Sequence, residues 1–336
     1  MRTYYGRVGR SLIRGTIRTN VLPWQKGWLG SSTMHIPDGF LSIPVWGTMD
    51  AIAVPSVAYI ARRAQREFDH HRIPLMGVMG AFIFAAQMIN FPVGNGTSGH
   101  LVGGALLSFT LGPAAASIVM TAILATQALV FQDGGLLALG ANVFNMAIAG
   151  VLAGYLPYVL LRGQKAGVFL GGMTSLLVSA SLALGELLRS GVRMPPTVLA
   201  VSIGLFFVSA IIEGAITLAV MQALERIQPG LVRRPQGVRA PGALIIASVA
   251  LAGAGVFIAS QRPDGIQRLA IETGIAANAR TFLTSPLADY KLQMLSSPIL
   301  TKSLAGLIGL FVVYVLCLGV SRALAAGRSL IAPRAN

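Results

Sequence analysis

The stretch PTVLAVSIGLFFVSAIIEGAITLAVMQ, residues 196–222, contains a single charged residue, Glu213. About 20 apolar residues in a helix cross the roughly 30 Å hydrocarbon core of a bilayer. The stretch therefore predicts a transmembrane helix. An unpaired carboxylate near the middle of such a helix is costly, so we expect Glu213 to face other helices and to have a partner among them.

The same property extends over most of the chain. Hydrophobic residues make up 54% of 336 positions and charged residues 11%, whereas soluble domains carry about 25% charged residues. This excludes an ordinary soluble protein and predicts an all-α polytopic membrane protein. About nine hydrophobic helices are expected, at residues 44–62, 74–91, 100–112, 114–131, 137–161, 166–189, 196–222, 242–260 and 303–322. The third is short for a span, and Gly112-Pro113 is expected to break it from the fourth.

The Lys and Arg residues predict the orientation of these segments. If residue 34 starts outside and each segment crosses once, 13 basic residues fall inside and seven outside, as the positive-inside rule requires. We therefore expect a multi-pass protein of the bacterial cytoplasmic (inner) membrane with its C-terminus inside. The net charge of +15 is explained by these loops, and no alternation of aromatic and basic residues indicates nucleic-acid binding.

Residues 1–33 form a doubtful extension. They hold six of the 26 basic residues, no acidic residue and no apolar core of a secretory signal. Six positive charges outside would oppose the predicted orientation. We expect Met34 to be the natural start, so that these residues are absent from or removed in the mature protein. A mitochondrial transit peptide is the alternative by composition.

A chain that begins Met34-His35 can chelate a metal ion. The terminal amine, the backbone amide nitrogen of His35 and its imidazole Nδ1 close two fused chelate rings, and one further imidazole completes a square of four nitrogens. Tetragonal nitrogen sites suit Ni(II) and Cu(II). His100 is the candidate fourth donor, because it follows the run Gly96-Thr97-Ser98-Gly99 at the outer side. The alternative for His100 is an interfacial histidine bonded to a carbonyl group or to water.

Five short runs are distinctive in combination. They are Met34-His35-Ile36-Pro37-Asp38-Gly39-Phe40-Leu41, Gln87-Met88-Ile89-Asn90-Phe91-Pro92, Gly96-Thr97-Ser98-Gly99-His100-Leu101-Val102-Gly103-Gly104-Ala105, Leu111-Gly112-Pro113 and Gly140-Ala141-Asn142-Val143-Phe144-Asn145-Met146. Over roughly residues 34–222 the chain resembles the CbiM/NikM family, the substrate-binding M components of cobalt/nickel energy-coupling-factor (ECF) transporters. The resemblance implies that Met34, His35 and His100 bind the ion, and that a transmembrane coupling (T) component and ATPase (A) subunits are partners.

Two later runs resemble a second component of these systems. Pro263-Asp264-Gly265-Ile266-Gln267 and Ser285-Pro286-Leu287-Ala288-Asp289-Tyr290 are similar to the outer-loop signature of the N-type (PDGLE-like) subunit, with Ile266 and Gln267 in place of its usual Leu-Glu. The implied role is to assist metal loading from outside. The implied fold is a seven-helix bundle like that of ECF substrate-binding components, followed by two C-terminal helices.

These expectations divide the chain into regions. The predicted regions are the extension 1–33, an M domain at 34–222, a cytoplasmic linker at 223–241 rich in Arg, Gly and Pro, an N-type two-helix domain at 242–322 with an outer loop at 261–302, and a cytoplasmic tail at 323–336. Within the M domain four amides are candidates to orient the metal ligands as a surrounding shell. They are Gln87, Asn90, Asn142 and Asn145, and interhelical hydrogen bonding is the alternative for each.

The sequence lacks the usual motifs of an energy-coupled or catalytic protein. It has no Gly-x-x-x-x-Gly-Lys-[Ser/Thr] phosphate loop, no Gly-x-Ser-x-Gly elbow and no His-Glu-x-x-His zinc motif. We therefore predict a non-enzymatic transporter subunit that imports Ni2+ or Co2+ with ATP hydrolysed by a partner, and no permanently bound cofactor. A secondary permease driven by an ion gradient and a membrane enzyme are the alternatives.

Overall fold

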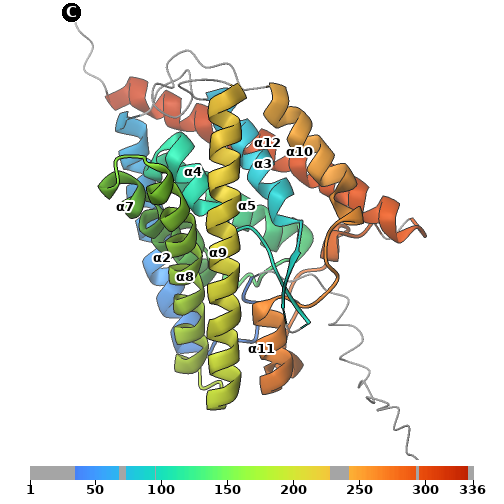
Figure 1. Ribbon diagram of the computed structural model, residues 1–336. Helices are drawn as coiled ribbons and strands as arrows, with labels where there is room; N and C mark the ends of the chain where they lie inside the picture. Colours follow the sequence, from blue (N-terminus) through green and yellow to red (C-terminus); the bar gives the residue numbers. More distant parts are fainter. Residues whose placement is uncertain (1–34, 68–72, 95, 228–241, 293–294, 332–336) are drawn as a thin grey trace, which may run out of the picture.

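The computed structural model describes residues 35–67, 73–94, 96–227, 242–292 and 295–331 (Figure 1). Its longer helices are α2 (Ile43–Glu67), α3 (Ile73–Gln87), α5 (Pro113–Thr126), α7 (Val151–Leu160), α8 (Lys165–Arg189), α9 (Pro196–Ile227), α10 (Gly242–Ala254) and α12 (Pro298–Ile331). The shorter elements are β1 (Phe91–Gly94), β2 (Thr97–Gly99), α4 (Gly104–Leu111), η2 (Gln127–Phe131), α6 (Leu139–Asn142), η3 (Val143–Gly150), η4 (Gly255–Phe257), α11 (Gly265–Thr273), η5 (Ile275–Asn278) and η6 (Ala288–Tyr290).

The predicted all-helical membrane fold is confirmed. Within the described ranges each of the nine apolar segments contains helix, and six helices are long and apolar enough to cross a bilayer. These are Ile43–Arg66, Pro113–Phe131, Leu139–Leu160, Lys165–Arg189, Pro196–Ile227 and Pro298–Ala326. The apolar helices Ile73–Gln87 and Gly242–Phe257 are shorter. Hydropathy locates spans well because a bilayer selects for apolar composition over about 20 successive residues.

The segment predicted at 100–112 contains only a short helix, as its length predicts. Helix α4 has eight residues and is therefore about 12 Å long, too short to span a bilayer by itself. Gly112, with φ at 82°, separates it from α5, and the two helices pack together. The residues before α4 approach it in a non-helical conformation, so His100 lies ahead of the helix rather than at its first turn.

Glu213 on α9 holds this non-helical segment in place. Its two carboxylate oxygens accept hydrogen bonds from the backbone N–H groups of Val102 and Gly103, each at 2.9 Å, and the side chain is fully buried. The expectation that Glu213 faces the bundle and has a partner is confirmed. Gly103 has φ at 76°, and an added Cβ would lie 2.8 Å from a side-chain carbon of Ile83, so this turn requires glycine.

The two C-terminal helices join the core of the preceding bundle. Helix α3 is buried over nearly its whole length, and α10 and α12 both pack against it (Figure 1). Cys317 on α12 is a buried free cysteine. Residues 228–241, most of the predicted linker, lie outside the described residues, as do residues 1–33 and the last five residues of the predicted tail, 332–336.

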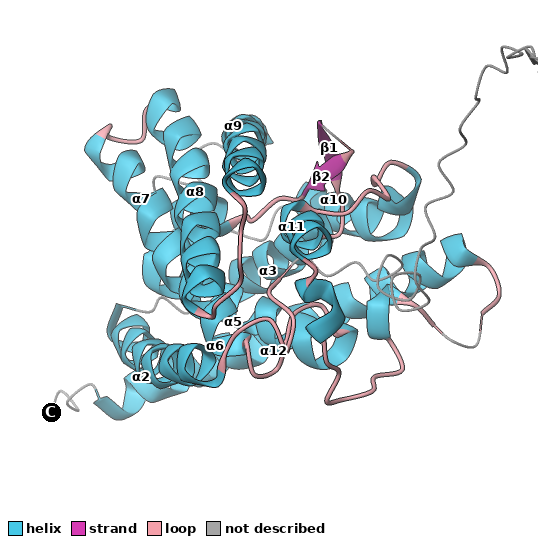
Figure 2. Cartoon of the chain, turned by 90° about the horizontal axis from the view of Figure 1, so that it is seen from below, coloured by secondary structure: helices cyan, strands magenta, loops and turns pink. Residues whose placement is uncertain are grey.

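The outer loop predicted at 261–302 contains a helix that its polar composition does not reveal. Asp264 accepts a hydrogen bond from the N–H of Gln267 at 2.7 Å, and the side chain of Gln267 accepts one from the N–H of Asp264 at 3.2 Å. This reciprocal capping box starts α11, and Gln at the third helical position performs it as Glu does. Figure 2 shows α11 beside the β1–β2 hairpin, which the sequence also did not predict.

Substitution of Glu213 tests the role of this carboxylate. Glu213→Ala should leave two buried N–H groups without an acceptor, at about 1–3 kcal/mol each, and should lower the thermal unfolding temperature in detergent. Glu213→Gln keeps one acceptor oxygen, so its unfolding temperature should lie between those of the wild type and Glu213→Ala. Ile203→Ala, which truncates a lipid-facing side chain on the same helix, is the matched control. Unfolding of Glu213→Ala at the wild-type temperature would contradict the assignment.

Candidate metal centre

Two of the three predicted metal ligands meet at one cavity. The imidazoles of His35 and His100 have ring centroids 6.1 Å apart and planes inclined by 58°. Both line a cavity of about 80 Å³ at the end of the bundle where β1, β2 and α11 lie. His35 is 2% exposed. Met34, the third predicted ligand, lies outside the described residues.

The separation of the rings is compatible with one shared ion. With metal–nitrogen bonds of about 2 Å, two imidazoles on one ion place their centroids roughly 4.5–6.5 Å apart, depending on the angle at the metal. Within the described ranges no group of three or more His, Cys, Asp or Glu side chains is arranged to hold an ion. His35 and His100 are therefore the pair of side-chain donors from which a centre can be built here.

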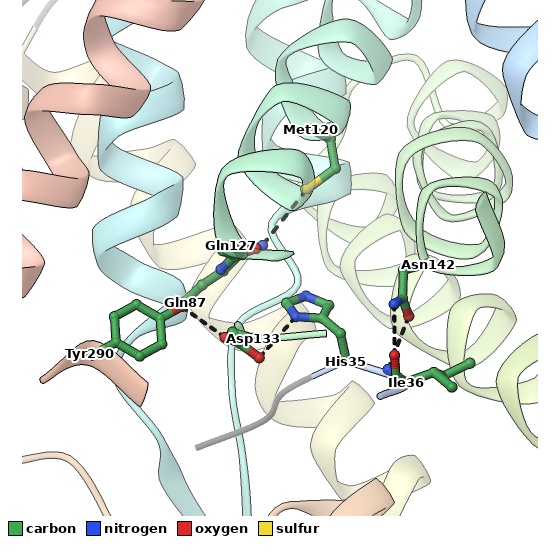
Figure 3. Close-up of polar contacts among 8 residues, drawn as sticks. All are labelled: His35, Ile36, Gln87, Met120, Gln127, Asp133, Asn142 and Tyr290. Atoms are coloured by element: carbon green, nitrogen blue, oxygen red, sulfur yellow. Dashed lines mark hydrogen bonds and ion pairs between the residues drawn. The ribbon is translucent and has the colours of Figure 1, made fainter. Parts of the chain in front are cut away.

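Asn142 anchors the chain on which His35 sits. The N–H of Ile36 donates to Oδ1 of Asn142, and Nδ2 of Asn142 donates to the carbonyl oxygen of Ile36, both at 3.0 Å (Figure 3). The N–H of Gly135 also donates to that carbonyl oxygen at 2.9 Å. Buried backbone groups need such partners, and these bonds hold the start of the described chain inside the bundle.

Asp38 continues this attachment three residues later. Its carboxylate accepts hydrogen bonds from the backbone N–H groups of Leu136, Leu137 and Ala138 at 2.8, 2.7 and 3.2 Å. Its own carbonyl oxygen accepts from the N–H of Arg280 at 2.9 Å. The segment is thus fixed between the turn before α6 and the region after η5, and His35 is placed by contacts on both sides.

Asp133 is a residue of the centre that the sequence analysis missed. Its Oδ1 lies 3.2 Å from Nδ1 of His35, and its Oδ2 accepts a hydrogen bond from the hydroxyl of Tyr290 at 2.8 Å (Figure 3). All three side chains are buried. One signal could have indicated it: Asp133 follows the predicted helix 114–131 at the outer side, where His35 is also expected.

Two ring nitrogens in the cavity lack partners. Among the described residues, Nε2 of His35 and Nδ1 of His100 are buried and accept or donate no hydrogen bond. Burial, together with the nearby His35, lowers the pKa of His100 to about 4. The imidazole of His100 is therefore neutral at pH 7, the state that a metal ligand requires.

The region after α10 supplies one wall of the cavity through Asp264. The N–H of Ser98 donates to the carbonyl oxygen of Pro263 at 2.9 Å, and its hydroxyl donates to that of Arg262 at 2.7 Å. Asp264 lines the cavity, and its Oδ2 is buried without a hydrogen-bond partner. Burial raises the pKa of Asp264 to about 7, against the opposing hydrogen bond from the N–H of Gln267.

The four predicted amides have different surroundings. Asn142 and Asn145 line the cavity, and Asn145 donates to Glu186 at 2.9 Å. Gln87 acts from further away, because its Nε2 donates to the carbonyl oxygen of Val102 at 2.8 Å. Asn90 lies instead on a separate cavity between α3, α10 and α12.

Comparison with known proteins relates this arrangement to metal transport. Residues 35–231 match the family model described as the cobalt uptake substrate-specific transmembrane region, and residues 240–326 match the PDGLE domain. A protein of Archaeoglobus fulgidus assigned as a fused nickel transport protein, NikMN, is 32% identical over 304 residues, which cover 86% of this chain and 98% of that protein. A protein of Haloquadratum walsbyi assigned to metal transport is 40% identical over 203 residues, 59% of this chain and 93% of its own length.

A solved structure agrees with these relatives. The crystal structure of a truncated transition metal transporter superposes with a TM-score of 0.51 at 34% sequence identity, over 57% of this chain and 99% of that one. The family match covers more than half of the chain and contains most residues that line the cavity, including His35 and His100. The chain therefore belongs to the family of cobalt uptake substrate-specific transmembrane regions, and it carries a PDGLE domain behind that region.

Proposed function

We propose that this membrane protein of the cobalt and nickel transport type is the substrate-binding subunit of an ATP-driven, ECF-type importer of Ni2+ or Co2+. The observation that carries the proposal is that His35 and His100, 65 positions apart in sequence, meet at one cavity. The relatives assigned to nickel and metal transport support it. Neutral imidazoles are good ligands for both ions.

The transported ion is bound by four nitrogens in this proposal. The terminal amine of Met34, the deprotonated amide nitrogen and Nδ1 of His35, and an imidazole nitrogen of His100 form a square. The His35 ring must then exchange its contact with Asp133 for the ion. The complex of a dication with one deprotonated amide has a net charge of +1, and a buried charge needs a partner of opposite charge. The Asp133 carboxylate next to His35 can be that partner.

The surrounding amides keep the donors in position. Asn142 holds the backbone beside His35, and Gln87 holds the carbonyl group of Val102 beyond His100. Asn145 contributes a cavity wall. A ligand-orienting role for Asn90 has no contact with this cavity to support it.

The rest of the chain connects the site to its partners. In this proposal residues 34–222 form the M domain, 223–241 the cytoplasmic linker, 242–322 the N-type domain and 323–336 the cytoplasmic tail. The protein lies in the cytoplasmic membrane with the residue 34 end outside and the C-terminus inside. Because the sequence has no phosphate-binding loop, ATP hydrolysis comes from separate A subunits, transmitted by a T component.

In the proposed four-nitrogen site, metal affinity depends on a free amine at Met34. Protein beginning at Met34 should bind Ni2+ tightly and show the d–d absorption of square-planar Ni(II). The chain of residues 1–336 lacks the free amine at Met34 and should bind at least 100-fold more weakly, without that absorption. His100→Ala in the shorter protein should lose the fourth nitrogen. Titration calorimetry and absorption spectra measure both properties, and equal affinity in all three proteins would refute the ligand set.

Asn142 provides a test of the anchoring contacts. Asn142→Leu removes both hydrogen bonds to Ile36 at similar volume, and loss of such an outer contact typically weakens metal affinity 10–100-fold. The absorption band of the Ni(II) complex should keep its position, because the donors are unchanged. Gln164→Leu, an exposed amide next to α8 at the other end of the bundle, is the control. Wild-type affinity in Asn142→Leu would disprove the anchoring role.

The energy source can be tested in cells. Uptake of radioactive nickel should require co-expression of an ATPase and a coupling membrane protein, and replacement of the phosphate-loop Lys of that ATPase should abolish it. The chain alone, with His100 intact, should give background uptake. Uptake by the chain alone that an uncoupler removes would instead identify a secondary permease.

A further inference from the structure

The arrangement of His35 in the structure differs from the one that the four-nitrogen chelate requires. The chelate uses Nδ1, yet Nδ1 is the nitrogen that faces Asp133 at 3.2 Å. A carboxylate accepts hydrogen bonds, so this contact places the ring proton on Nδ1 and leaves the lone pair on Nε2. Nε2 is buried and has no partner.

A second ring nitrogen in the same cavity also has no hydrogen-bond partner among the described residues. Nδ1 of His100 is buried without a partner, and both histidines line the cavity together with Asp264. A cavity of about 80 Å³ holds an ion with several waters, since one water needs roughly 10–15 Å³. None of these groups depends on the amine of Met34.

The geometry points to a capture site in which a hydrated Ni2+ or Co2+ is first bound between Nε2 of His35 and Nδ1 of His100, with Asp133 and Tyr290 positioning the His35 ring. A metal-bound histidine commonly donates its other ring N–H to a carboxylate, which fixes the tautomer and orients the ring. Asp133 is such a carboxylate, and water molecules complete the coordination of the captured ion. The site deepens the function proposed above, because it precedes the chelate in the same cavity.

Tyr290 holds Asp133 from the PDGLE domain. Its hydroxyl donates to Oδ2 of Asp133, and its ring stacks on Phe131 with centroids 4.6 Å apart and planes 13° from parallel. The hydroxyl of Ser285 donates to the carbonyl oxygen of Val130. The loop that carries Tyr290 is therefore attached directly to the residues that lead to Asp133.

The backbone of this loop is strained at the contact. Asp289 and Tyr290 both have φ at 56°, a left-handed conformation that costs non-glycine residues about 1–3 kcal/mol each. Such strain persists only where surrounding contacts enforce it. Here the enforced conformation delivers the Tyr290 hydroxyl to Asp133, so the C-terminal domain acts on the His35 ring through one carboxylate.

The test uses the chain of residues 1–336, in which the capture site is complete and the chelate is not. Co2+ titrations followed by absorption and X-ray absorption spectroscopy should show one ion bound by two imidazoles and water oxygens. His35→Ala and His100→Ala should abolish this binding. Asp133→Asn should weaken it 10–100-fold, and Tyr290→Phe, which keeps the stacked ring, about 3–10-fold. Tyr59→Phe, an exposed hydroxyl on α2, is the matched control.

A double-mutant cycle separates positioning from structural effects. If Tyr290 acts through Asp133, Tyr290→Phe should change Co2+ affinity little once Asp133→Asn is present, because the two losses are not additive along one chain of contacts. Thermal unfolding reports any structural damage in either variant. Additive losses, or Co2+ affinity unchanged in both single variants, would overturn the positioning role. No Co2+ binding by the chain of residues 1–336 would overturn the capture site.

The two proposals fail in different measurements. If protein beginning at Met34 forms no square-planar Ni(II) complex while residues 1–336 still bind Co2+ through both histidines, the chelate is wrong and the capture site stands. If the square-planar complex forms but residues 1–336 bind no Co2+, the chelate stands and the capture site is wrong.

Discussion

The pair of hydrogen bonds between Asn142 and the backbone of Ile36 is the contact on which the centre depends. An extended chain segment can enter a helical bundle only if its N–H and C=O groups are satisfied there. The Asn142 amide satisfies both groups of one residue as a neighbouring strand would. His35 is therefore carried into the interior, beside an imidazole from a segment that Glu213 fixes in a similar way.

Two buried carboxylates serve this protein as acceptors for irregular backbone. Glu213 binds the residues before α4, and Asp38 binds the residues before α6. Irregular backbone within a membrane protein is tolerated only where it is satisfied by protein or water. Of the 11 acidic residues in the chain, these two hold non-helical segments that lie next to the cavity.

The C-terminal helices and outer loop complete structures that belong to the preceding bundle. Helices α10 and α12 bury α3, while α11 and the loop ending at Tyr290 close the outer end around Asp264 and Asp133. The fusion therefore places a second domain in contact with the groups that set the orientation of His35. This arrangement gives the PDGLE domain a physical means to influence metal loading in the proposed function.

The sequence by itself determined the membrane spans, because a bilayer selects for local apolar composition. It also showed that Glu213 needs a partner, because an unpaired carboxylate within an apolar span is costly. It also identified His35 and His100 as the candidate pair. Only the tertiary structure decided which atoms meet: the roles of Asp133 and Tyr290 and the docking of α11 escaped prediction. The reason is physical, since these features depend on contacts between residues such as His35 and Asp133, 98 positions apart, or Asp133 and Tyr290, 157 apart. No local composition or periodicity encodes such contacts.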